Sequence, residues 1–167
     1  MARAPLAPRP ISPRGFAALR TEYDALFGSE RPKLVETIAW AAANGDRSEN
    51  GDYIYGRKRL HEVDRRIDHL SRLMTAAQVV DPAAQADRSH VYFGATVLIV
   101  PLDGDGDDAW RRVTLVGDDE ADATDSRISW NSPLARALRG AAVGNVREVI
   151  LPGGSRAYEI LTIEYPD

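Results

Sequence analysis

Three carboxylates lie close together in one short polar stretch of the chain, NGDRSENGDYIY at residues 44–55. They are Asp46, Glu49 and Asp52. Mg²⁺ prefers carboxylate oxygens and usually keeps several water ligands, so Asp46 and Glu49 are suited to magnesium but are too few to hold it tightly alone. If this stretch binds Mg²⁺, the site has to be completed by ligands from a partner molecule.

The same residues also fit a purely structural interpretation. Asp46 and Glu49 have the spacing of a capping box, in which the first side chain accepts a hydrogen bond from a free backbone N–H and the glutamate reaches back. Ser48 is a second candidate for the cap. The pattern alone leaves the metal site and the helix cap both open.

A first helix is predicted to lead into this stretch. Ser12 followed by Pro13 matches an N-cap residue followed by proline at the first helical position. Apolar residues then recur at helical spacing. Glycine and proline within residues 28–32 predict a kink or a brief break. The pattern ends at Asn44, a residue that commonly terminates helices.

A second helix is predicted over residues 50–77, with a length of about 42 Å at 1.5 Å per residue. Its apolar residues alternate spacings of three and four, which is typical of a coiled-coil seam. The seam consists of Tyr53, Gly56, Leu60, Val63, Ile67, Leu70 and Met74. Because the connection between the helices is short, they are predicted to be antiparallel neighbours. We therefore expect an antiparallel coiled-coil domain over residues 12–79, with its tip at about residues 44–52.

Basic side chains recur along the second helix in two neighbouring rows. They are Lys58, Arg59, Arg65, Arg66 and Arg72. One interpretation is a ridge that follows a phosphate backbone. The alternative is a solvated flank, because Glu62, Asp64 and Asp68 lie close enough to pair with several of these side chains. His61 and His69 also allow a metal site on this helix, but a solvated surface is favoured.

Composition excludes several classes of protein. The chain has 167 residues, 44% of them hydrophobic and 28% charged, as in ordinary globular proteins. It has no cysteine, which excludes disulfides, iron–sulfur clusters and thiol chemistry. No apolar run approaches the roughly 20 residues of a membrane helix, so we expect no membrane partner and a cytoplasmic location. Basic residues predominate in residues 1–80 and acidic ones afterwards, which suggests that the first half faces an acidic partner such as nucleic acid.

The remaining segments predict a second domain of different character. Residues 1–11 are proline-rich and are expected to be flexible. Residues 80–90 are predicted to be a linker. Beyond it, five strand-like runs and one short helix at residues 132–138 predict a small mixed sheet over residues 91–167. The expected fold class is thus α+β with two domains.

Several motifs together resemble the bacterial Gre transcript cleavage factors, closer to their GreB type. They are ERP at 30–32, GDRSEN at 45–50, RKRLHEVDRRIDHL at 57–70, YFGA at 92–95 and SPLARAL at 132–138. The resemblance implies an N-terminal coiled coil and a C-terminal FKBP-like domain without prolyl isomerase activity. It further implies that the globular domain docks on bacterial RNA polymerase and that the coiled coil enters the secondary channel.

The resemblance also implies roles for particular residues. Asp46 and Glu49 would share Mg²⁺ with the polymerase active centre, and the basic ridge would contact the nascent RNA 3′ end in a backtracked complex. Asn131, Ser132 and Pro133 would dock on the polymerase, although GreB-type proteins commonly have aspartate at position 131. The chain would thus be a monomeric accessory factor, not an enzyme, with no cofactor of its own.

Two other functions remain open at this point. A regulator of the same fold would occupy the secondary channel without stimulating cleavage. A general coiled-coil nucleic-acid binder would bind free RNA without polymerase and without the tip carboxylates.

Overall fold

The computed structural model describes residues 4–45, 50–103 and 110–167. Within them the chain forms two compact units. One unit is Phe16–Ala77 together with the segment that ends at Pro8. The other is Arg9–Gly15 together with Gln78–Asp167. The helices of the N-terminal half and the mixed sheet of the C-terminal half confirm the predicted α+β class, whereas the coiled coil and the FKBP-like fold stay predictions.

The first helical arm is continuous but changes its hydrogen bonding midway. It consists of α1 (Pro13–Ala25), a π-helical turn η1 (Leu26–Glu30) and α2 (Arg31–Ala43). Pro32 cannot donate a backbone hydrogen bond to the preceding turn, and the N–H of Arg31 reaches back five residues to the carbonyl of Leu26. The kink or brief break predicted near residues 28–32 is therefore a π-helical turn within a continuous helical arm.

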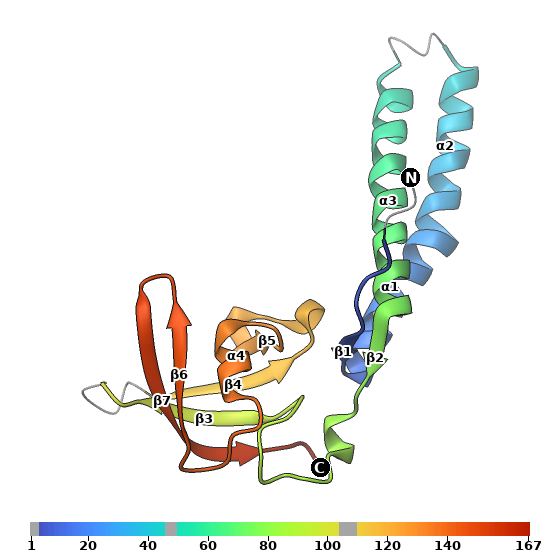
Figure 1. Cartoon of the computed structure of the whole chain (residues 1–167). Coiled ribbons are helices and arrows are strands. Elements are labelled where there is room, and N and C mark those ends of the chain that lie inside the picture. Colours follow the sequence, from blue (N-terminus) through green and yellow to red (C-terminus); the bar gives the residue numbers. More distant parts are fainter. Residues whose placement is uncertain (1–3, 46–49, 104–109) are drawn as a thin grey trace. The chain divides into compact units, whose positions relative to one another are not determined.

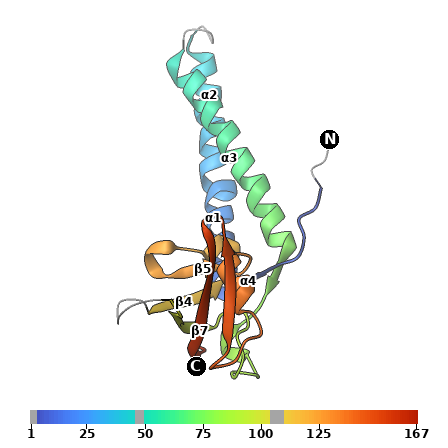
Figure 2. The ribbon, with the colours of Figure 1, turned by 60° about the vertical axis from the view of Figure 1, so that its left-hand side comes forward.

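The second arm is α3 (Gly51–Ala76), a helix of 26 residues that lies beside α2 in both ribbon views (Figures 1 and 2). Every predicted seam position is buried or half-buried. Gly56 is buried against Ile38, and a Cβ atom at Gly56 would lie only 2.9 Å from Cγ1 of Ile38. A glycine therefore allows the two helices to approach closely at this point.

The C-terminal unit is built on a five-stranded mixed sheet in the order β5-β4-β3-β7-β6. Its strands are β3 (Thr96–Pro101), β4 (Arg111–Val116), β5 (Arg127–Ser129), β6 (Val146–Leu151) and β7 (Gly154–Glu164). Among the described strands of this sheet, only β4 and β5 pair in parallel. A register shift between Leu98 and Ile99 interrupts the β3–β7 ladder, and β7 curves strongly (Figure 1).

Helix α4 (Pro133–Leu138) covers this sheet with two buried side chains, Ala135 and Leu138. They join a core to which Ile99, Leu115 and Ile160 contribute from three neighbouring strands. Short 3₁₀ helices η2 (Pro82–Ala84), η4 (Asp118–Glu120) and η5 (Ala123–Asp125) lie in the connections. The predicted strands and the predicted short helix are thus present.

The last three residues of the proline-rich segment form regular structure. Residues 9–11 of the segment predicted to be flexible form strand β1 (Arg9–Ile11), which pairs with β2 (Ala77–Val79). Ile11 is buried, and its carbonyl accepts a hydrogen bond of 2.8 Å from the N–H of Val80. Residues 9–11 are therefore held in place by both packing and hydrogen bonds.

Candidate functional site

The end of the helix pair that leads to the predicted tip is organised by Asn50. Its side-chain oxygen accepts a hydrogen bond of 3.2 Å from the N–H of Tyr53 and so caps α3. Its side-chain nitrogen donates to the carbonyl of Ala41 in α2 at 2.7 Å. This role of Asn50 was not predicted from the sequence, although an asparagine directly before a helix start is a common capping signal.

The two tip carboxylates, Asp46 and Glu49, lie outside the described residues, as does Ser48. They belong to the connection between the end of α2 and the start of α3. The structural interpretation assigned the cap of the following helix to Asp46 or Ser48, but α3 takes its cap from Asn50. The third carboxylate, Asp52, is exposed in the first turn of α3. A negative charge at this end of a helix interacts favourably with the helix dipole and so stabilises the helix.

Two members of the basic ridge form ion pairs between the helical arms. Arg66 makes two hydrogen bonds to the carboxylate of Glu22, at 2.6 and 2.8 Å. These hydrogen bonds outweigh partial burial and hold the pKa of Glu22 below its ordinary value. Arg59 donates a hydrogen bond of 2.7 Å to the carboxylate of Glu30, and this bond raises the pKa of Arg59. The guanidinium of Arg59 also lies 3.4 Å from the carboxylate of Glu62. The acidic partners predicted for this flank thus come partly from the other arm.

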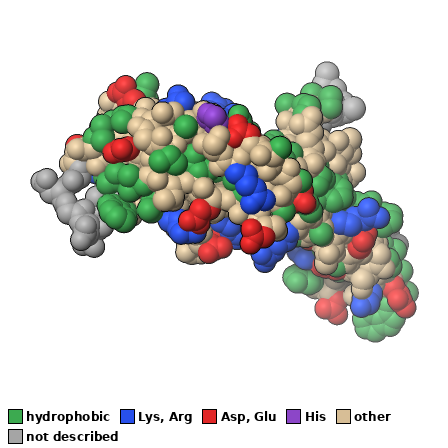
Figure 3. Space-filling view, turned by 90° about the horizontal axis from the view of Figure 1, so that it is seen from below, with side chains coloured by type: hydrophobic (Ala, Val, Ile, Leu, Met, Phe, Trp, Pro, Cys, Tyr) green, Lys and Arg blue, Asp and Glu red, His purple; other side chains and the backbone are tan. Residues whose placement is uncertain are grey.

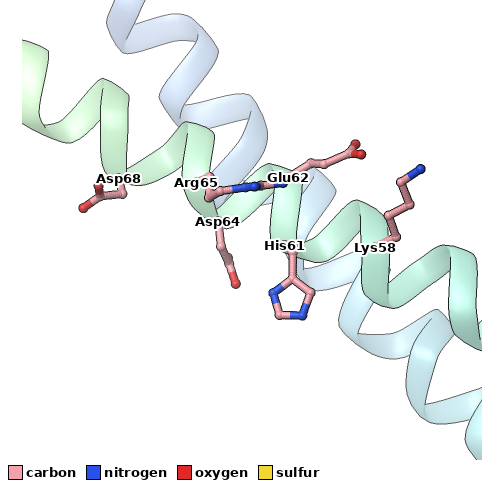
Figure 4. Close-up of a pocket in the computed structure, with 6 residues that line it drawn as sticks. All are labelled: Lys58, His61, Glu62, Asp64, Arg65 and Asp68. Atoms are coloured by element: carbon pink, nitrogen blue, oxygen red, sulfur yellow. The ribbon is translucent and has the colours of Figure 1, made fainter.

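The other ridge members have different surroundings. Lys58 and Arg65 line an open hollow on α3, and within the described part of the chain neither forms an ion pair (Figure 4). Arg72 donates to the carbonyl of Ala4 at 2.8 Å. The hollow is lined by Lys58, His61, Glu62, Asp64, Arg65 and Asp68.

Charges of both signs are mixed on the surface. On the face shown in Figure 3, Lys and Arg side chains are interspersed with Asp and Glu and do not form one continuous basic surface. His61 and His69 do not belong to any group of three or more potential metal ligands among the residues that the structure covers. None of the described helices is long and apolar enough to cross a membrane.

The predicted docking residues lie at the start of α4. Ser132 caps this helix by accepting a hydrogen bond of 3.2 Å from the N–H of Ala135, and Pro133 is its first residue. Asn131 and Pro133 are exposed, whereas Ser132 is half-buried. The three residues therefore lie between β5 and the first turn of α4.

A polar cluster supports this segment. The side chain of Asn131 bonds both Asp118 of η4 and Arg139 at the end of α4. Asp118 also accepts a hydrogen bond of 2.8 Å from Arg9 of β1. The roles of Asp118, Arg139 and Arg9 were not predicted from the sequence, because their contacts join distant parts of the chain.

A separate hollow of about 410 Å³ lies in the C-terminal unit. Phe93, Leu115 and Tyr165 contribute to its lining together with three arginines, Arg14, Arg112 and Arg127. None of the site residues predicted from the sequence lines it.

Comparison with known proteins gives matches along most of the chain. Residues 9–79 match the family described as "Transcription elongation factor, N-terminal", and residues 85–165 match "Transcription elongation factor, GreA/GreB, C-term". A transcription elongation factor GreB of Neisseria meningitidis serogroup A is 48% identical over 157 residues, which cover 93% of each chain. A GreA of Ralstonia nicotianae is 41% identical over 156 residues, covering 93% of this chain and 97% of the relative. Among solved structures, the Gfh1 protein of Thermus thermophilus shares 19% identity with a TM-score of 0.42, covering 94% of this chain and 99% of the other.

Proposed function

The chain belongs to the GreA/GreB family of transcription elongation factors, and from this premise we propose that it is a transcript cleavage factor. Factors of this family act on RNA polymerase as accessory factors. In the proposed function the helix pair enters the secondary channel of bacterial RNA polymerase. There it stimulates the polymerase's own endonucleolytic cleavage of the nascent RNA 3′ end in backtracked, arrested complexes. We expect the factor to act as a monomer in the cytoplasm.

The observation that carries this proposal is the capping of α3 by Asn50. The competing explanation for Asp46 and Glu49 was a capping box at the start of this helix, and Asn50 already fills the cap. The cap on Asn50 therefore supports a role for Asp46 and Glu49 other than capping α3. Their position in the connection between α2 and α3 suits donation to another molecule.

The donor set fits magnesium only as a shared ligand. Two carboxylates supply the hard oxygen atoms that Mg²⁺ binds, but Mg²⁺ requires six ligands in near-octahedral geometry. Asp46 and Glu49 would therefore hold the ion jointly with the polymerase active centre. A second metal ion held there by Asp46 and Glu49 would supply activation of the attacking water or stabilisation of the leaving oxygen in phosphodiester hydrolysis. The contribution of this chain is to bring the carboxylates to that point.

The cleavage assay uses a backtracked elongation complex with RNA labelled at its 3′ end. We expect the wild-type chain to release short 3′ fragments in the presence of Mg²⁺. Asp46→Asn and Glu49→Gln should each reduce the stimulated rate at least about tenfold, because each removes an anionic ligand, while both variants still compete with wild type for polymerase. Asp52→Asn is the matched control, since it removes a neighbouring carboxylate from the first turn of α3, and it should retain activity.

The alternatives give different results in the same assay. A wild-type chain that binds polymerase but releases no fragments would indicate a channel regulator that inhibits or competes without promoting cleavage. Normal cleavage by both carboxylate variants would contradict the metal-ligand role. Binding to free RNA that is unaffected by Asp46→Asn and independent of polymerase would indicate a general nucleic-acid binder.

The residues proposed to contact RNA fall into two groups, those that form an ion pair with the other helical arm and those that do not. Arg59 and Arg66 join the helical arms through Glu30 and Glu22, whereas Lys58 and Arg65 have no ion-pair partner in the described structure. We expect Lys58→Ala combined with Arg65→Ala to weaken cleavage of long backtracked RNA more than of short, because loss of each phosphate contact reduces salt-sensitive affinity. Equal losses on long and short RNA would contradict an RNA-contacting role.

A further inference from the structure

Asn131 lies between a carboxylate and a guanidinium group. Its Nδ2 is 3.1 Å from Oδ2 and 3.3 Å from Oδ1 of Asp118, and its Oδ1 accepts a hydrogen bond of 3.1 Å from Arg139. A side-chain amide can donate at one atom and accept at the other, whereas an ionised carboxylate can only accept. Asparagine therefore satisfies both neighbours at once.

Asp118 is itself held by several donors. The hydroxyl of Ser129 and the guanidinium of Arg9 both donate to its carboxylate. Partial burial acts to raise the pKa of Asp118, but the hydrogen bonds from Ser129 and Asn131 and the charge of Arg9 outweigh it and lower the pKa. Asp118 is therefore ionised at neutral pH, and the donors around it hold its carboxylate beside the amide of Asn131.

Arg139 holds the other side of the same segment. Its guanidinium lies 3.8 Å from the ring centroid of Trp130 and donates to the backbone carbonyl of that residue. The chain from Ser129 to Asn131 is thus clamped between η4 and the end of α4. This clamp sets the direction in which the next residues, Ser132 and Pro133, begin the helix.

We propose that Asp118 is a positioning residue for the docking segment Asn131–Pro133, and that position 131 of this chain has to be an amide because Asp118 supplies the carboxylate beside it. The inference rests on the proposed function, in which this segment contacts RNA polymerase. Aspartate at position 131 would bring two carboxylates within about 3 Å, where like charges repel and one of them is protonated more readily.

The test measures the affinity of full-length variants for core RNA polymerase at neutral pH and at about pH 5. Asn131→Asp should weaken binding about tenfold at neutral pH, the equivalent of one pKa unit. This loss of affinity should become smaller as the pH falls. Asp118 and the aspartate introduced at position 131 then share one proton, which restores a hydrogen-bond donor between them. The double variant Asp118→Asn/Asn131→Asp exchanges the amide and the carboxylate, and it should regain affinity to within about threefold of wild type.

Asp119→Asn is the matched control, because Asp119 lies next to Asp118 and pairs only with Arg9, at 3.7 Å, among the described residues. It should leave affinity unchanged within about twofold. Thermal unfolding of each variant by circular dichroism verifies that it is folded at the assay temperature.

Three results would overturn the inference while leaving the proposed function intact. They are wild-type affinity in Asn131→Asp at neutral pH, a double variant that binds no better than Asn131→Asp, and a loss of affinity explained entirely by loss of folded protein. Failure of the wild-type chain to bind polymerase would instead overturn the proposed function, and this inference with it.

Discussion

The side-chain amide of Asn50 donates a hydrogen bond to the backbone carbonyl of Ala41 at 2.7 Å and thereby joins the start of α3 to the last turn of α2. The same side chain caps α3 through its oxygen. Both contacts adjoin the connection that carries Asp46 and Glu49. The local stability of this end of the helix pair therefore depends on one side chain.

We expect Asn50→Ala to destabilise this end of the helix pair by about 1–2 kcal/mol, because it removes the cap and also leaves a carbonyl without its donor. Asn50→Asp should cost less, since aspartate retains the capping oxygen and loses only the donor. Hydrogen exchange of the Tyr53 and Ile54 amides measures the local effect. Equal protection in wild type and Asn50→Ala would show that Asn50 does not organise this end.

Two glycines of α3 should respond in opposite ways to the same substitution. Around Gly51 no atom of the described residues lies within 4 Å of an added Cβ, so Gly51→Ala should stabilise the chain by up to about 1 kcal/mol through higher helix propensity. At Gly56 the added Cβ would lie 2.9 Å from Ile38, so Gly56→Ala should cost about 1–3 kcal/mol by overpacking. Thermal unfolding of the two variants measures both effects. A shift of the same sign in both would contradict the close helix contact at Gly56.

Local sequence patterns were sufficient to predict most secondary structure. The Ser12 cap is confirmed by a hydrogen bond of 3.0 Å from the N–H of Gly15, and the seam of α3 is buried or half-buried as its spacing predicts. Such features depend on neighbours within one or two helical turns. The π-helical turn before Pro32 was predicted only as a kink or a brief break, because glycine and proline indicate an interruption but not which hydrogen bonds replace the regular ones.

Contacts between distant residues were not predictable in this way. Glu22 and Arg66 are 44 positions apart, so the helical spacing of the basic ridge gave no indication of that pair. Asp118 meets Asn131 because η4 follows β4 and Asn131 follows its parallel neighbour β5. Strand β1 is only three residues long and contains proline, so its pairing left no periodic signal. These features depend on tertiary packing, which overrides local propensity.

The Glu22–Arg66 pair should make stability depend on pH. Because the pKa of Glu22 is lowered in the folded chain, the pair stabilises the fold above the ordinary glutamate pKa of 4.5 and loses this effect as the pH falls through the lowered value. Glu22 is 41% exposed, so we expect Glu22→Gln to cost less than about 1 kcal/mol at neutral pH and nothing in strong acid.

Thermal unfolding of Glu22→Gln at both pH values, with Glu36→Gln as a control, measures this dependence. Glu36 is also exposed on the first arm but makes no ion pair in the described structure. The same destabilisation at both pH values would show that the charge of Glu22 is not responsible.

Ser12 connects the start of α1 to η4 within the C-terminal unit. Its hydroxyl donates to the carboxylate of Glu120 and also caps α1, while its N–H donates to Glu120 at 3.1 Å. We expect Ser12→Ala to destabilise the chain by about 1–2 kcal/mol through loss of the cap and of one charged hydrogen bond. Because Ile11 precedes it, the β1–β2 pair should also open more often. Exchange of the Val80 amide, which bonds the carbonyl of Ile11, should therefore accelerate.

The control for Ser12→Ala is Ser155→Ala, because Ser155 is exposed on β7 of the same unit and makes no side-chain hydrogen bond in the part of the chain that the structure describes. It should change neither the unfolding temperature nor the exchange of Val80. If Ser12→Ala lowers the unfolding temperature while Val80 stays fully protected, then Ser12 acts only as the cap of α1. Strand β1 would in that case be held by the burial of Ile11 and the ion pair of Arg9 with Asp118.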